Sequence, residues 1–303
     1  MYLINKQIVY VSGLPRSGST LLCQLLDHHK DIHSPGYSSP LASIIETIRQ
    51  SVSSNNFFLS QLDSDFDTAY NRLYRSYRAF INGWLDDSTA SLIVDKSRAW
   101  LGMLQTISTI DPNYKMIVCI RDLVQLYGSI DKQHKNTILI SYSDQHTTNS
   151  SWYRADQAYS PTGVVGGPLR AIENLQDIDK EYKADSNIYF LKYENLITNT
   201  NNELANIARF LGIENFDIDL TNLIVKPHES DSHYRFKFRH NTYSSIFPMH
   251  QHKVPKRIAS EIVQKFKWYY DFFYPTLYKE LMALPIPKTS FGGSRQGENN
   301  GPA

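Results

Sequence analysis

The sequence of 303 residues has little of what marks several common classes of protein. It contains only two cysteines, too few for a disulfide framework, and both Cys23 and Cys119 lie in apolar patterns typical of reduced core residues. No apolar stretch approaches the roughly 20 residues that a membrane span needs. The first residues also lack the apolar core and cleavage site of a signal peptide. We therefore expect a soluble, cytoplasmic protein with no membrane span.

The sequence also lacks an excess of charge of either sign. Its 31 Lys and Arg residues against 30 Asp and Glu residues leave a formal charge of +1. This balance excludes a polybasic nucleic-acid wrapper and an acidic disordered protein. We expect no nucleic-acid partner, and any anion must be held by a local site rather than by the overall field.

Four short apolar runs predict buried strands. Because each run is followed by a helical pattern, they predict a three-layer α/β/α fold with a central parallel sheet of about five strands. Neither an internal repeat nor a shift in composition marks a boundary, so we expect one domain over 1–286 and a flexible tail over 287–303. The four runs are 8–11, 92–94, 116–120 and 188–191.

A glycine-rich segment, GLPRSGST (13–20), lies between the first predicted strand and the first predicted helix. Its spacing is that of a nucleotide-binding P-loop, but Ser19 stands where the P-loop has its lysine, and Arg16 is the only nearby cation. Backbone N–H groups at such a turn favour a bound phosphate or sulfate. The candidate binding residues here are Gly13, Pro15, Arg16, Ser17, Gly18, Ser19 and Thr20.

A second anion site is predicted where the third strand ends. Arg121 follows this strand directly, and Ser129 comes eight residues later on the next predicted helix. Strand ends in parallel sheets face the ligand crevice, and a guanidinium with a hydroxyl suits a second phosphate.

These segments together resemble the sulfotransferase family that uses 3′-phosphoadenosine 5′-phosphosulfate, and its tyrosylprotein and bacterial branch in particular. The resemblance implies this nucleotide as donor, a hydroxyl- or amine-bearing acceptor and no metal. It also implies that Lys96 and Arg16 act in catalysis and that Tyr193 lies near the nucleotide. The segments that carry the resemblance are GLPRSGSTLL (13–22), VDKSRAW (94–100), IRDLVQLYGS (120–129) and LKYENLITN (191–199).

The chain departs from that branch at the general base. The family's catalytic glutamate position falls on Tyr37, so the base cannot be carried over. Histidine or carboxylate is best suited to take a hydroxyl proton near neutral pH. The candidates near the expected crevice are His33, Asp95 and, more remotely, Glu46.

Two other functions stay open at this point. A P-loop nucleotide kinase would use Asp95 to hold Mg²⁺, although Lys96 beside it and Ser19 in the loop argue against this. A non-catalytic nucleotide-binding module that has lost its base is the other. Basic and aromatic residues alternate over 233–240, which indicates either a solvated strand face or a lid or acceptor-binding strip.

Overall fold

The computed structural model describes residues 3–136, 150–182, 187–226, 229–230, 239–240 and 242–278. The chain divides into two compact units, Met1–Val254 and Pro255–Ala303. The predicted tail over 287–303 and most of the basic and aromatic segment over 233–240 lie outside the described residues.

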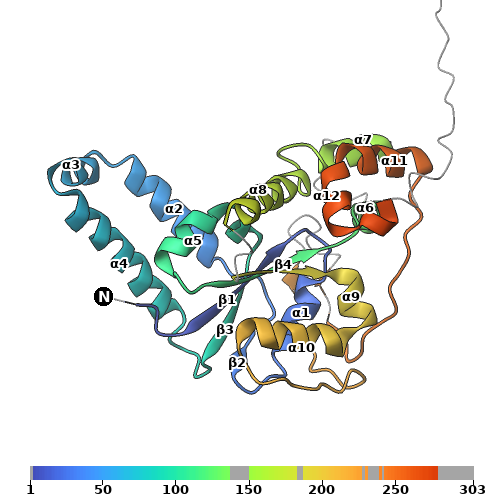
Figure 1. Ribbon diagram of the computed structural model, residues 1–303, viewed down its shortest axis with the longest axis horizontal. Helices are drawn as coiled ribbons and strands as arrows, with labels where there is room; N and C mark the ends of the chain where they lie inside the picture. The colour runs from blue at the N-terminus through green and yellow to red at the C-terminus, as the bar shows by residue number, and fades with distance from the viewer. Residues whose placement is uncertain are drawn as a thin grey trace, which may run out of the picture. The chain divides into compact units, whose positions relative to one another are not determined.

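A five-stranded parallel sheet forms the centre of the first unit, as Figure 1 shows, and its order is β2-β3-β1-β4-β5. Helices cover both of its faces, so the predicted three-layer α/β/α fold is confirmed. The first strand is central, with β3 on one side and β4 on the other, and ligands bind at such a switch point beyond the carboxyl ends of the strands. The strands are β1 (Gln7–Gly13), β2 (Ile32–His33), β3 (Leu92–Lys96), β4 (Lys115–Ile120) and β5 (Ile188–Lys192).

Twelve α-helices and one 3₁₀ helix are assigned in the described residues. Those of the first unit are α1 (Ser19–Leu26), α2 (Leu41–Ser53), α3 (Asn56–Ser64), α4 (Phe66–Trp84), η1 (Arg98–Met103), α5 (Leu104–Ile110), α6 (Leu123–Asn136), α7 (Ser151–Ala158), α8 (Gly166–Tyr182), α9 (Tyr193–Thr198) and α10 (Thr200–Leu211). A short antiparallel ribbon joins β6 (Glu229–Ser230) to β7 (Arg239–His240). The second unit contains α11 (Lys256–Lys265) and α12 (Lys267–Phe273).

The two faces of the sheet bury different side chains. On one face, strand residues such as Val9, Val94 and Ile117 pack in one core with leucines of α1 and α10. On the other face, the Tyr10 ring meets the Trp100 ring of η1 edge to face, with 5.0 Å between centroids. Because side chains alternate along a strand, neighbouring residues at a strand end face different layers.

Two connections between the strands have particular local structure. The chain between β3 and β4 forms the 3₁₀ helix η1 followed by α5. Helix α8 begins at Gly166 and has a proline in its first turn, where proline is tolerated. A side chain at Gly166 would meet the Ser160 carbonyl oxygen at 1.9 Å, so the chain needs glycine here.

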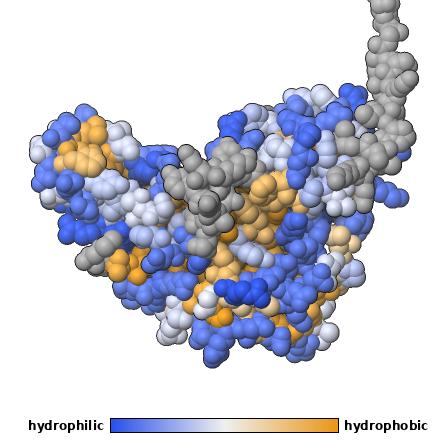
Figure 2. All heavy atoms as spheres, viewed as in Figure 1, coloured by the Kyte–Doolittle hydropathy of each residue, from blue (hydrophilic) through white to orange (hydrophobic). Residues whose placement is uncertain are grey.

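The helices α2, α3 and α4 form an arm that carries exposed aromatic side chains. Hydrophobic side chains gather at α3, on the left in Figure 2. Phe57 of α3 and Phe66 of α4 are 83% and 58% exposed. Among the described residues, no helix combines the length and apolar character that crossing a membrane requires.

Candidate functional site

The loop between β1 and α1 has the backbone that its glycines predict. Gly13 and Gly18 both have positive φ, and a side chain on Gly13 would lie 2.1 Å from the Cys119 carbonyl oxygen. Gly18 directly precedes α1, and a side chain on it would lie 2.7 Å from the Tyr193 ring. Only glycine allows this close approach, which leaves the N-terminus of α1 open to an anion.

Arg16 is strained in this loop. Its φ of 60° makes it the one described residue other than glycine with a positive φ. Such a conformation persists where its surroundings hold it. Here the Arg16 carbonyl accepts a 2.9 Å hydrogen bond from Arg121 Nη1, and Arg16 Nε donates to Ser129 Oγ at 3.3 Å.

The two predicted anion sites therefore meet. Arg121 follows β4 and is 5% exposed, and Ser129 on α6 is 6% exposed. The guanidinium of Arg121 also lies over the Tyr193 ring, 4.3 Å from its centroid. Four of the predicted binding residues, Arg16, Arg121, Ser129 and Tyr193, are thus in contact at the carboxyl edge of the sheet.

Lys96 faces the same loop. It pairs with Val11 at the end of β3, and its Nζ donates to Thr20 Oγ1, in the first turn of α1, at 3.3 Å. Although it is a lysine, only 6% of its surface is exposed. The structure thus brings a buried ammonium to the helix end where the loop presents its N–H groups.

Asp95 faces the opposite layer. Its carboxylate accepts a 2.7 Å hydrogen bond from the Trp100 indole and another from Ser39. Burial raises the pKa of this carboxyl, although both hydrogen bonds oppose the shift. The Ser39 N–H donates to the Lys96 carbonyl at 2.8 Å, so residue 39 contacts both the Asp95 carboxylate and the backbone at the end of β3.

The other candidate bases lie in different surroundings. His33 is an exposed residue at the end of β2. Glu46 of α2 is hydrogen-bonded to Arg49, and this contact lowers the pKa of its carboxyl. Tyr37, at the position of the family's glutamate, is 53% exposed.

One part of the site carries no motif and was missed in the sequence. The backbone N–H of His252 donates to Gln125 Oε1 of α6 at 2.7 Å. The Cβ of His252 lies so close to Gly128 that a side chain there would come within 2.3 Å of it. Gly128 precedes Ser129, so the chain near residue 252 borders the predicted second anion site. Glycine at position 128, inside a helix, was the only available signal, because it permits such close packing.

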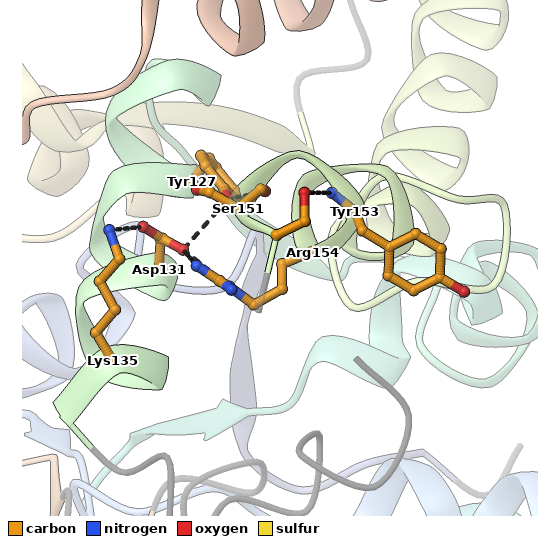
Figure 3. A network of polar contacts seen from close by, with 7 residues as sticks. Tyr127, Asp131, Lys135, Ser151, Tyr153 and Arg154 are labelled. Carbon is orange, nitrogen blue, oxygen red and sulfur yellow. Dashed lines mark hydrogen bonds and ion pairs between the residues drawn. The ribbon is translucent and has the colours of Figure 1, made fainter. Parts of the chain in front are cut away.

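A polar network holds α6 to α7 behind this site. Asp131 of α6 reaches Arg154 of α7 in Figure 3, and Arg154 Nε donates to its carboxylate at 3.0 Å. Lys135 contacts the same carboxylate at 2.7 Å. These two cations hold the pKa of Asp131 below its usual value, against the effect of burial. Tyr127 completes the link through Ser151, whose Oγ is 2.8 Å from its hydroxyl.

A parallel α/β sheet with a glycine-rich anion loop at its central strand defines a P-loop-like nucleotide-binding fold. A family model described as the sulfotransferase family matches residues 8–217, more than half of the chain. The chain therefore belongs to the sulfotransferase family, and the resemblance found in its motifs is confirmed. Within the described residues, no group of three metal-binding side chains comes together.

Several solved structures match the chain at low sequence identity. The sulfotransferase domain from the curacin biosynthetic pathway is 18% identical, with 86% of this chain and 98% of that chain covered and a TM-score of 0.49. The sulfotransferase domain of the Synechococcus PCC 7002 olefin synthase is 19% identical, with 72% and 76% covered and a TM-score of 0.45. A sulfotransferase from Alicyclobacillus acidocaldarius is 16% identical, with 70% and 83% covered and a TM-score of 0.45. No curated protein sequence matches the chain.

Proposed function

We propose that this protein transfers a sulfonate group from 3′-phosphoadenosine 5′-phosphosulfate to a hydroxyl or amine acceptor. One observation carries the proposal: Arg16 joins the two anion sites. Its backbone belongs to the glycine-rich loop, its side chain donates to Ser129, and its carbonyl accepts from Arg121. A nucleotide with anionic groups at its 3′ and 5′ positions needs two such sites side by side.

The residues present fit this donor. The loop from Gly13 to Gly18 offers backbone N–H groups at the N-terminus of α1, and added side chains would clash at both glycines. We assign the 5′ end of the nucleotide to this loop, together with Pro15, Ser17, Ser19 and Thr20. The 3′-phosphate is assigned to Arg121 and Ser129, since a guanidinium offers two parallel donors.

The catalytic assignment rests on the placement of cations. The donor supplies an activated sulfonyl group, whose transfer places negative charge on the peripheral and bridging oxygens. Lys96 would stabilise that charge from the end of β3, and Thr20 Oγ1 fixes the direction of its ammonium. Arg16 would stabilise the same developing charge from the glycine-rich loop.

For the acceptor's proton, His33 and Asp95 stay the candidate bases. We propose that Asp95 works through Ser39, because its carboxylate faces the opposite layer from Lys96 and Ser39 contacts both this carboxylate and the Lys96 carbonyl at the end of β3. The raised pKa of Asp95 suits this role, since a base works best when its pKa approaches the working pH.

The same placement disfavours a kinase. An acid that holds Mg²⁺ has to face the phosphates, whereas the carboxylate of Asp95 accepts from the Trp100 indole in the other layer. Calorimetry should show that 3′-phosphoadenosine 5′-phosphate binds without Mg²⁺ and that ATP binds poorly. Equal affinity for 5′-AMP would remove the proposed 3′-phosphate site.

Turnover tests the catalytic part, with 3′-phosphoadenosine 5′-phosphosulfate and a panel of alcohols, phenols and amines. Lys96→Met should lower kcat by about 10²–10³, the usual cost of losing a charge-stabilising donor. Affinity for 3′-phosphoadenosine 5′-phosphate should change little, because the charge that Lys96 stabilises develops during transfer.

Lys115→Met is the matched control. Lys115 begins β4, at the opposite end of that strand from Arg121, and its Nζ lies 4.9 Å from the Phe210 ring centre. We expect normal turnover from it. A folded Lys96→Met protein with near-normal kcat would contradict the catalytic role of Lys96. Nucleotide binding without turnover on any acceptor would instead favour the non-catalytic module.

A further inference from the structure

His252 is fixed against α6 beside the second anion site. Its backbone exchanges two hydrogen bonds with the Gln125 side chain, at 2.7 Å and 3.4 Å. Its Cβ and Cγ, together with Val254, fill the space that a side chain at Gly128 would need. The His252 side chain therefore starts from a defined place beside Gly128, the residue before Ser129, although His252 lies outside the range of the family match, 8–217.

Basic groups surround this imidazole. The groups that act on it are Arg16 of the glycine-rich loop, Arg121 after β4, Lys132 of α6 and His250 of its own segment. The ring of His250 lies 4.7 Å from that of His252, edge to face. Partial burial and these cations lower the pKa of His252 to about 4. At neutral pH the ring is therefore neutral when no anion is bound.

An anion between Arg121 and Ser129 would reverse this balance. Two of the four groups, Arg16 and Arg121, are those assigned to the nucleotide. A phosphate bound to them offsets their charge and adds negative charge near the ring, and both effects favour imidazolium.

We propose that His252 is a specificity-determining residue that takes up one proton from solvent when the 3′-phosphate of the nucleotide binds. The proton adds to the free ring nitrogen, and the imidazolium then contributes attraction that only a 3′-phosphorylated nucleotide induces. This inference rests on the proposed function, because it assigns the anion at Arg121 and Ser129 to that phosphate.

The size of the effect follows from linkage. If binding returns the pKa of His252 from about 4 to its ordinary value near 6.5, uptake is about 0.9 proton at pH 5.5 and about 0.1 at pH 7.5. The sign is that of a raised pKa: the extra affinity is full only below the free-state pKa of about 4, declines above it, and is lost as pH rises through the bound-state pKa near 6.5. Affinity should therefore be about 10-fold higher at pH 5.5 than at pH 7.5 from this residue alone.

Calorimetry with 3′-phosphoadenosine 5′-phosphate, in two buffers of different ionisation heat, measures the uptake. Phosphate groups also titrate near pH 6, so the quantity that decides is the difference between the wild type and His252→Gln. We expect the wild type to take up about 0.8–0.9 proton more at pH 5.5. The control is His250→Gln, an exposed neighbour in the same segment, which should keep most of the uptake. Binding of 5′-AMP, which lacks the 3′-phosphate, should show no such difference.

Nuclear magnetic resonance of the histidine ring protons gives a second measurement on the unaltered protein. The pKa of His252 should rise when 3′-phosphoadenosine 5′-phosphate is added. Normal binding with equal proton uptake in the wild type and His252→Gln, or an unchanged His252 titration, would overturn the proposal and leave the proposed function standing. Failure of 3′-phosphoadenosine 5′-phosphate to bind at all would overturn both.

Discussion

Arg16 offers a test in which stability and binding should separate. Its φ is 60°, a conformation in which the Cβ of any residue other than glycine lies unfavourably close to the following carbonyl oxygen. Glycine adopts this conformation freely, whereas alanine keeps the strain. Both Arg16→Gly and Arg16→Ala remove the guanidinium and its 3.3 Å contact with Ser129. The two variants therefore differ only by one methyl group and by its effect on the backbone conformation.

The expected difference in stability follows from the cost of the left-handed conformation and from the chain entropy that glycine loses on folding. The left-handed conformation costs an ordinary residue about 1–2 kcal/mol, and glycine loses about 0.5–1 kcal/mol more than alanine in chain entropy on folding. The free energy of unfolding of Arg16→Gly should thus exceed that of Arg16→Ala by about 0.5–1 kcal/mol. Nucleotide affinity should fall in both, by about 10- to 150-fold, since hydrogen bonds to charged groups contribute about 1.5–3 kcal/mol.

Urea denaturation measures the first quantity, and calorimetry with 3′-phosphoadenosine 5′-phosphate measures the second. Equal stability of the two variants would show that the backbone of residue 16 is not strained in solution. Unchanged affinity in both variants would refute the role of Arg16 in joining the two anion sites, because both lack the guanidinium and its contact with Ser129.

Two further predictions concern the residues that support the site. Arg121→Ala should lower nucleotide affinity by about 10- to 150-fold in calorimetry, and Ser129→Ala should lower it less. If Arg121→Ala binds the nucleotide normally, Arg121 has a structural role only. Asp131→Asn should lower the free energy of unfolding by about 1.5–3 kcal/mol at pH 6. Because the pKa of Asp131 is lowered in the folded protein, this stabilisation is full above the ordinary aspartate pKa of about 3.9 and is lost as pH falls through the folded value. Thermal unfolding of both proteins between pH 6 and pH 3 checks this, and a difference that grows with acidity would contradict the sign.

The strands that build the site could be predicted because their residues form uninterrupted apolar runs. Those runs lie within β1, β3, β4 and β5; the first three strands are buried, whereas β5 at the sheet edge is mostly half-buried. The remaining strand, β2, could not be predicted, since Ile32 and His33 are its only residues and two residues show no period. Its place at the sheet edge comes from pairing with β3.

The anion sites could be predicted singly but not as one cluster. Arg16 and Arg121 follow strand ends, and both strands end at the same edge of the sheet. The contact between Arg16 and Ser129 joins residues 113 positions apart, and it depends on a positive φ that is uncommon for arginine. Local pattern holds no information on such a contact.

The orientations of Lys96 and Asp95, in contrast, could have been read from the strand itself. Val94 and Lys96 share one face of β3 and Asp95 takes the other, because side chains alternate. The lysine therefore faces α1 and the glycine-rich loop, whereas the aspartate faces Trp100. The structure thus separates a cation at the loop from an acid in the opposite layer, which hydrogen-bonds to Ser39 near the strand end.

The position of His252 could not be predicted from a motif. Its segment has no glycine loop, no apolar period and no resemblance to the family, and it meets α6 from more than 100 positions away in sequence. What brings it there is a missing side chain, since any residue larger than glycine at position 128 would displace it. A site that binds two anionic groups concentrates positive charge, and that charge, together with partial burial, lowers the pKa of His252. The consequence is that a histidine without a motif becomes the group whose protonation reports whether the second anion is bound.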